Sequence, residues 1–418
     1  MINQARITVL SRRGALLGMG AFLAACAGGG AGGGIAGGGG AARAPSSFRW
    51  HAAANPAFDA WVQGFTARAT ARGIPANVVS RAMQTARFIP EVVEKDRNQI
   101  EVKRSLEDYL AIAASDERIA QGRGALARMG GTLNAIEARY GVPAEVVTAV
   151  WGLESFYGTR MGDVPVFSAL STLAYDGRRG AFFESQLIAA LKIVSAGDVV
   201  PENMLGSWAG AMGHTQFIPT SYLAYAVDFT GDGRRDIWGG DPTDALASTA
   251  AYLAKSGWQR GQPWGEEVAA PSGLASARKS AAEWAALGVA GANGGRLRGS
   301  GAATLLQTGG PAFLLYSNYN VILRYNNAQS YAIGVGHLSD RIAGAGPLRA
   351  GFGPDSAGMT IDQRRALQQR LAGLGYDIGT PDGVIGPKTN ATISAYQTSR
   401  GLPATGQPSL ALLLALGG

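Results

Sequence analysis

The 418-residue sequence predicts a mainly α-helical protein with a helical body, a small β-containing subdomain and a C-terminal helical unit. Apolar residues recur at helical spacing over residues 56–90, as in Phe58, Trp61 and Phe65. The alternation that is typical of strands is scarce until late in the chain. The chain is long enough for two or three domains, and its 46% hydrophobic content argues against disorder throughout.

Residues 1–26 are predicted to be a lipoprotein signal peptide rather than part of the fold. The apolar run from Ala15 to Ala25 is too short to span a bilayer well. It ends in a sequence that resembles a bacterial lipobox, so Cys26 is the expected lipidation site. The preceding Arg12-Arg13 resembles a twin-arginine export signal. An ordinary cleaved signal with a chance cysteine is the alternative.

Cys26 is also the only cysteine in the chain, which excludes disulfides, zinc-cysteine sites and thiol catalysis from the mature body. Ala27 follows it, and by resemblance to Gram-negative lipoproteins this residue favours the outer membrane. Residues 27–46 are a Gly/Ala-rich linker with almost nothing to pack, which predicts a flexible tether.

Residues 47–345 are expected to form the main body. The breaker Gly73-Ile74-Pro75 separates two helices, and further amphipathic helix is predicted from Arg104 to about Arg128. Residues 313–316 and 321–323 are short β-prone runs, too few for a large sheet. The Gly/Ala/Ser-rich stretch 269–308 contains one short predicted helix and suggests a small subdomain.

A helix predicted to begin near Pro143 and to end at Gly158 carries an isolated carboxylate near its end. Glu154 lies four residues after Val150 and seven after Val147, so it projects from the apolar side of the helix. Burial there disfavours the ionised form and raises the pKa of the carboxyl, which suits a group that protonates a glycosidic oxygen. The alternative is a structural glutamate paired with Arg160.

Two further motifs accompany this helix. Residues 206–222 form a run of small and polar residues, in which Ser207 and Gln216 can hydrogen-bond a sugar. His214 in this run is expected to line the loop and not to bind a metal. With the Glu154 helix, this run resembles the membrane-bound lytic murein transglycosylase B family, of the glycoside hydrolase family 103 type. The resemblance covers most of residues 56–345 and includes the motifs Tyr175-Asp176-Gly177-Arg178-Arg179 and Arg324-Tyr325-Asn326-Asn327.

The resemblance implies a lysozyme-like helical catalytic domain that cleaves the β-1,4 bond from N-acetylmuramic acid to N-acetylglucosamine. It implies that a single glutamate, here Glu154, acts first as acid and then as base, giving a 1,6-anhydro end. No second carboxylate has a motif argument, although most glycosidases use two. The family's glycan contacts fall on Tyr109, Arg178, Arg179, Ser207, Gln216, Tyr252, Asn326 and Tyr331.

Residues 228–236 follow the opening of an EF-hand loop, with oxygen side chains at positions 1, 3 and 5 and glycine at position 6. Position 12 is a glycine, and Asp244 lies further on. The related family has an extended loop of this kind, so a structural Ca²⁺ is a candidate; no cofactor is expected to be required. An Asp/Gly turn that binds no ion is the alternative. The candidate ligands are Asp228, Thr230, Asp232, the carbonyl of Arg234 and Asp244.

A second linker at 346–357 precedes a compact unit at 358–418. The motif Asp382-Gly383-Val384-Ile385-Gly386-Pro387-Lys388-Thr389 resembles the three-helix peptidoglycan-binding domain. Its glycines make a turn, and Thr389 is expected to cap the next helix. The unit has no acid pair or nucleophile, so binding is its expected role, and a purely structural cap is the alternative.

Taken together, these features predict a lytic transglycosylase that acts in cell-wall remodelling. The expected protein is a periplasmic monomer, anchored by lipid to the outer membrane of a Gram-negative bacterium, with peptidoglycan glycan strands as its partner. The alternative is a non-catalytic peptidoglycan-binding scaffold lipoprotein. The net charge is +7, or +4 once residues 1–25 are removed, and no Lys/Arg run is interleaved with aromatics, so nucleic acid is not an expected partner.

Overall fold

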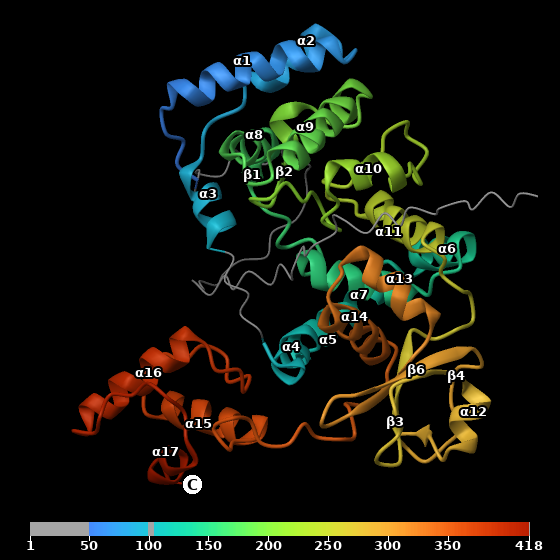
Figure 1. Ribbon diagram of the computed structural model, residues 1–418, viewed down its shortest axis with the longest axis vertical. Coiled ribbons are helices and arrows are strands. Elements are labelled where there is room, and N and C mark those ends of the chain that lie inside the picture. The colour runs from blue at the N-terminus through green and yellow to red at the C-terminus, as the bar shows by residue number, and fades with distance from the viewer. Residues whose placement is uncertain (1–49, 99–103, 418) are drawn as a thin grey trace, which may run out of the picture.

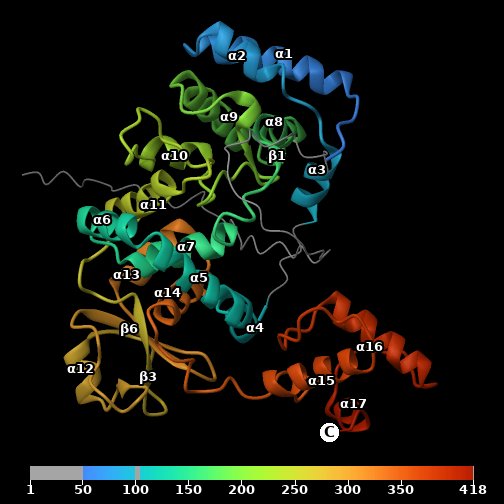
Figure 2. The same cartoon turned by 180° about the vertical axis from the view of Figure 1, so that it is seen from behind.

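The computed structural model describes residues 50–98 and 104–417. The predictions for the signal peptide, for Cys26 and for the Gly/Ala-rich linker lie outside these residues. Within them, no helix combines the length and the apolar character that a membrane crossing requires. Figures 1 and 2 show a mainly helical molecule with one small sheet and a separate C-terminal group of helices, so the predicted fold class is confirmed.

The first helical lobe brings together the start of the chain and a segment from its middle (Figure 1). Its core contains Phe58, Phe65, Phe167 and Leu170, all nearly inaccessible to solvent. Burial of such side chains is the main stabilising contribution, about 2 kcal/mol each. The helices of this lobe are α1 (Pro56–Ala71), α2 (Ala76–Met83), α3 (Pro90–Arg97), α8 (Val166–Asp176), α9 (Gly180–Ser195) and α10 (Pro219–Tyr225). A short turn, η1 (Pro201–Asn203), follows α9.

The second lobe is built around one buried helix, α7 (Ala144–Ser155). Val147, Ala149 and Val150 of this helix are fully buried, and all of its residues except Glu145 and Glu154 are buried. A helix that is apolar all round is expected in such an interior position. The helices that surround it are α4 (Leu106–Ala113), α5 (Asp116–Arg128), α6 (Gly130–Tyr140), α11 (Thr243–Lys255), α13 (Ser317–Tyr325) and α14 (Gln329–Ile342).

The β-subdomain is inserted between α11 and α13. Its five strands are all antiparallel and follow the order β4-β6-β7-β3-β5. Trp284, on the short helix α12 (Ala281–Ala286), is fully buried and donates its indole N–H to the carbonyl of Ala303 at 3.0 Å. The strands are β3 (Gly265–Ala269), β4 (Arg278–Ser280), β5 (Ala290–Gly291), β6 (Ala302–Gln307) and β7 (Ala312–Leu315). A separate pair, β1 (Val164–Pro165) and β2 (Leu205–Gly206), lies in the first lobe.

The C-terminal domain consists of α15 (Ile361–Gly373), α16 (Pro387–Ser399) and α17 (Leu410–Ala415) around a small core of their own. Arg364 of α15 is 5% exposed and reaches α4 of the helical body. Its guanidinium donates to Glu107 at 2.7 Å and to Asp108 at 3.0 Å. This ion cluster therefore connects the C-terminal domain to the body.

Three local predictions differ from the structure. Thr389 does not cap α16, because the helix already begins at Pro387 with Gly386 as its N-cap, and the Thr389 hydroxyl instead accepts from Gln368. The helix expected from Arg104 to Arg128 is interrupted, because Ser115 accepts a hydrogen bond from the N–H of Arg118 and caps a new helix, α5. Residues 321–323 lie within α13 rather than in a strand. Their β-branched side chains pack against α14 and α11, and this tertiary packing overrides the local β propensity.

Candidate active site

The buried helix α7 ends at Ser155, immediately after Glu154, in an unusual backbone conformation. Phe156 and Tyr157 have φ values of 51° and 57°, in the left-handed region that non-glycine residues rarely adopt. The rings hold them there, because Tyr157 donates its hydroxyl to the carbonyl of Arg118 at 2.7 Å and Arg118 lies over the ring of Phe156. The helix end that carries Glu154 is thus fixed by packing on both sides.

Glu154 itself lies in a largely apolar environment with one direct partner. The hydroxyl of Tyr331, on α14, donates to its Oε1 at 2.5 Å. Burial raises the pKa of Glu154 to about 7, although the Tyr331 hydrogen bond opposes that rise. Residue 154 as a whole keeps an intermediate solvent exposure. A carboxylic acid that is still protonated near neutrality can act as a general acid.

Three tyrosines face this carboxyl from different helices. Burial, and next the charge of Glu154, raise the pKa values of Tyr109 on α4, Tyr325 on α13 and Tyr331 on α14. These tyrosines therefore stay neutral and can donate hydrogen bonds near Glu154. Tyr331 is hydrogen-bonded to Glu154, and Tyr109 is close enough for the charge of Glu154 to raise its pKa.

The polar run at 206–217 wraps around the segment that follows α7. Gln216, with φ of 54°, donates its amide to the carbonyls of Met161 and Gly213 at 2.9 and 2.8 Å. A Cβ on Gly162 would lie 2.3 Å from the carbonyl of Gly206, so this close approach requires glycine. The hydroxyl of Ser207 accepts from the N–H of Ala211 and keeps its own proton for another acceptor.

The remaining aromatic contacts come from α11 and α13. Tyr252 donates its hydroxyl to the carbonyl of Arg324, and its ring lies 4.9 Å from that of Tyr325. Tyr325 donates in turn to the carbonyl of Thr215 at 2.6 Å, which ties α13 to the polar run. The side-chain oxygen of Asn326 is buried and has no protein partner. An orphaned acceptor of this kind is costly unless a ligand or water satisfies it.

The arginine pair lies at the turn from α8 to α9. Arg178 forms an ion pair with Asp96 of α3, which is 3% exposed. Arg179 lies over the rings of Phe182 and Phe183 at the start of α9. Both arginines are therefore oriented by residues of the first lobe, and neither of these contacts involves Glu154.

The EF-hand-like loop brings together three of the predicted ligands. Single carboxylate oxygens of Asp228, Asp232 and Asp244 lie within 4.8 Å of one another. Thr230 contacts Asp228 at 3.3 Å through its hydroxyl, whereas Arg234 is exposed and its carbonyl has no described contact to the group. Converging carboxylates repel one another, and a bound divalent cation would relieve that repulsion. Ca²⁺ prefers oxygen ligands, which these side chains supply. The donor set thus fits Ca²⁺.

Arg235, which lies within this loop, is paired with a carboxylate outside it. Arg235 forms an ion pair with Asp198 at 2.5 Å and also donates its backbone N–H to that carboxylate. Its charge is therefore compensated away from the three aspartates.

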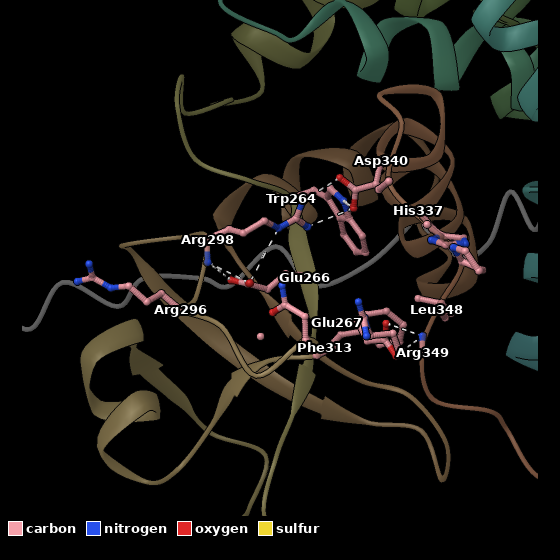
Figure 3. Close-up of a pocket in the computed structure, with 16 residues that line it drawn as sticks. Trp264, Glu266, Glu267, Arg296, Arg298, Phe313, His337, Asp340, Leu348 and Arg349 are labelled. Atoms are coloured by element: carbon pink, nitrogen blue, oxygen red, sulfur yellow. Dashed lines mark hydrogen bonds and ion pairs between the residues drawn. The ribbon is translucent and has the colours of Figure 1, made fainter.

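A separate cavity of about 550 Å³ lies between the β-subdomain, the end of α14 and residues 345–349 (Figure 3). Figure 3 shows Arg298 between Glu266 and Asp340, with Trp264 beside Asp340. Because Arg298 pairs with Glu266 of β3 and with Asp340 of α14, it connects the sheet to α14 at the cavity wall.

Sequence reasoning missed three residues that shape this site. Tyr325 lies in the motif Arg324-Tyr325-Asn326-Asn327, but only Asn326 of that motif was predicted to contact the glycan. Asp96, which orients Arg178, carries no motif at all. His214 was expected only to line a loop, but its ring contacts Trp151 and the carbonyl of Gly239. The adjoining glycines were the available signal for such close packing.

The fold and the single desolvated carboxyl at a buried helix end define a lysozyme-like class of helical protein. The model of the Transglycosylase SLT domain family matches residues 57–340, and that of a peptidoglycan binding domain matches residues 360–416. The chain therefore belongs to the Transglycosylase SLT domain family and carries a C-terminal peptidoglycan binding domain.

Several relatives support this assignment. The chain is 35% identical over 214 residues to the membrane-bound lytic murein transglycosylase B of Escherichia coli, a match that covers 49% of this chain and 58% of that relative. The crystal structure of SltB3 from Pseudomonas aeruginosa with NAG-NAM-pentapeptide is 47% identical, with a TM-score of 0.69, and the match covers 86% of this chain and 99% of that one. Slt35 of E. coli in complex with calcium is 28% identical, with a TM-score of 0.59 and coverage of 69% and 93%.

Proposed function

We propose that this protein is a peptidoglycan lytic transglycosylase. The observation that carries the proposal is Glu154, a desolvated carboxyl whose pKa is raised to about 7 and which accepts a hydrogen bond from Tyr331. Two relatives support the substrate class, since SltB3 was crystallised with NAG-NAM-pentapeptide and with NAG-anhNAM-pentapeptide.

In the proposed reaction Glu154 acts twice. Its protonated carboxyl first gives a proton to the glycosidic oxygen, and the bond to C1 of N-acetylmuramic acid breaks. The substrate's own acetamido group stabilises the cationic centre. The carboxylate of Glu154 then takes the proton of the O6 hydroxyl as O6 bonds to C1, which leaves a 1,6-anhydro end and a neutral Glu154. No water is consumed.

The neighbouring acidic side chains already have partners, which agrees with a mechanism that uses a single carboxylate. Three acids near the site in sequence already have partners: Asp163 accepts from the indole of Trp50, Asp176 pairs with Arg97, and Glu184 pairs with Arg68. A retaining or inverting glycosidase instead needs a second carboxylate aimed at the same bond. The engagement of these three acids supports a reaction in which Glu154 has no carboxylate partner.

The glycan contacts that we propose come from both helical lobes. Ser207 offers a free hydroxyl proton, and Asn326 offers an unpaired carbonyl oxygen to a sugar hydroxyl. Tyr252 and Gln216 already have backbone partners and are proposed to shape the cleft as well as to contact the ligand. The further proposed contacts are Tyr109, Arg178, Arg179 and Tyr331.

The test is mass spectrometry of muropeptides released from purified sacculi. The wild-type protein should release anhydro-muropeptides, and Glu154→Gln should release none while its circular dichroism and melting temperature show a folded protein. Reducing ends would identify a hydrolase instead. Wild-type turnover by Glu154→Gln would exclude Glu154 as the acid, and a complete lack of release by the wild-type protein would favour the non-catalytic scaffold.

The C-terminal domain is proposed to hold the enzyme on the wall. Tethering a binding domain to a catalytic domain raises the effective concentration of the enzyme at its substrate. We further propose a periplasmic monomer, exported through the twin-arginine route and anchored in the outer membrane through a lipid on Cys26. Radiolabelled palmitate should be incorporated by the wild-type chain and not by Cys26→Ala.

We also propose that the loop at 228–244 binds a structural Ca²⁺ through Asp228, Thr230, Asp232, Asp244 and the carbonyl of Arg234. The three converging carboxylates support this, as does the calcium complex of the E. coli relative Slt35. Calorimetric titration should give heat and a raised melting temperature with the wild-type protein and neither with Asp228→Asn/Asp232→Asn. An absence of heat with the wild-type protein would exclude the site.

A further inference from the structure

We propose that His214 is a positioning residue, which holds the last turn of α7, and with it Glu154, by bridging Trp151 to Gly239. The inference rests on the lytic transglycosylase function proposed above and adds a residue that acts on the acid/base from outside the substrate cleft.

The two ring nitrogens of His214 have different partners, and those partners fix its tautomer. The indole N–H of Trp151 lies 3.2 Å from Nδ1, and an indole can only donate, so Nδ1 accepts. Nε2 lies 2.7 Å from the carbonyl oxygen of Gly239, which can only accept, so Nε2 carries the proton. Burial lowers the pKa of His214, in agreement with a neutral ring.

Residues on both sides of Glu154 abut His214. Trp151 lies three residues before Glu154, about one helical turn. Ser155, the next residue, donates its hydroxyl to the carbonyl of His214 at 2.5 Å. A Cβ on Gly158 would lie 2.5 Å from Nδ1 of His214, so the chain after the helix also passes against the ring. The rotation of the last turn, which aims Glu154, is therefore set at His214.

Hydrogen bonds also fix the end of the bridge at Gly239. The N–H of His214 donates to the carbonyl of Ile237 at 2.9 Å. The N–H of Gly239 donates to Asp236 at 2.9 Å, and the N–H of Asp236 donates to Asp244 at 3.0 Å. His214 thus connects the catalytic helix to the aspartate-rich loop, and the segment 236–239 serves as its anchor.

Two substitutions separate the two ends of the bridge. His214→Asn places an acceptor near the position of Nδ1, so it can still bind the Trp151 indole. His214→Gln reaches the carbonyl of Gly239 and leaves Trp151 without an acceptor. On a soluble peptidoglycan fragment, His214→Gln should lower kcat roughly 10- to 100-fold with KM within about twofold of the wild type, because a misplaced acid is costly to the reaction. His214→Asn should stay within about threefold.

Equal losses of kcat in the two variants, or losses that lie in KM, would refute the proposal. Trp151→Phe removes the donor at the other end and should match His214→Gln. The double variant should lose no more than either single variant, since both remove one interaction. Additive losses would show independent structural effects.

A readout without turnover separates this inference from the proposed function. The indole ¹⁵N–¹H resonance of Trp151, assigned as the signal lost in Trp151→Phe, should shift in His214→Gln and stay near its wild-type position in His214→Asn. An unchanged resonance in His214→Gln would overturn the bridge even if the wild-type protein proved catalytically inactive. If the resonance shifts in His214→Gln but the wild-type protein releases no product, only the proposed function is refuted.

Discussion

The buried carboxyl of Glu154 should make the folded protein less stable as the pH rises through neutrality. Its pKa is raised from 4.5 to about 7 by burial, so between these values the folded state binds a proton that the unfolded chain has released. The free-energy contribution is therefore fully present below pH 4.5 and is lost as the pH rises through about 7. A shift of this size corresponds to about 3 kcal/mol at most, and partial solvent access reduces it to about 1–3 kcal/mol.

Glu154→Gln removes this titration while it keeps a side-chain oxygen that accepts the hydroxyl proton of Tyr331. Urea unfolding of both proteins at about pH 5 and about pH 8.5 isolates the effect, because every other titrating group cancels in the comparison. The variant should gain about 1–3 kcal/mol relative to the wild type between the two pH values. Parallel pH dependences would show that Glu154 ionises normally in the folded state, which would contradict its assignment as a neutral acid.

Two other substitutions test the packing around the site and the link between domains. Gly152→Ala would bring a Cβ within 2.6 Å of the Tyr157 ring, so it should lower the free energy of thermal unfolding by about 1–3 kcal/mol. Gly131→Ala, which has open space around the added Cβ, should be neutral or stabilising. Equal effects of the two substitutions would contradict the packing argument. Arg364→Met leaves the partly buried Glu107 without its ion-pair partner, so it should lower the free energy of unfolding by roughly 3 kcal/mol. The same substitution should speed limited proteolysis of the linker at 346–357. Unchanged proteolysis would indicate that other contacts hold the C-terminal domain.

The sequence was sufficient for the fold class because helical periodicity and helix breakers are local signals. The end of α7 was placed near Gly158, but the structure ends it at Ser155, since two left-handed residues follow. That conformation depends on contacts of Tyr157 with a distant helix and could not be predicted from local propensity.

The site residues that belong to sequence motifs could be predicted. Those that depend on ion pairs or hydrogen bonds between distant residues could not. Glu154 was expected to be buried from its position on the apolar face, and its raised pKa agrees with that reasoning. The alternative partner, Arg160, instead lies over the ring of Phe156. The ion pair of Arg178 with Asp96 and the two hydrogen bonds of His214 join residues far apart in the sequence, and no spacing rule indicates such pairs.

The hydrogen bond between Tyr331 and Glu154 spans 177 residues of chain. A ribosome that adds about 5–20 residues per second needs roughly 10–35 s to make that stretch. During this interval α7 exists without α14, so the face that α14 covers is open and Glu154 lacks the hydroxyl of Tyr331. The proposed acid/base therefore gains this partner only late in synthesis, and a chain that is truncated before α14 lacks Tyr331. Topology alone thus delays the appearance of an activity that would attack the cell wall.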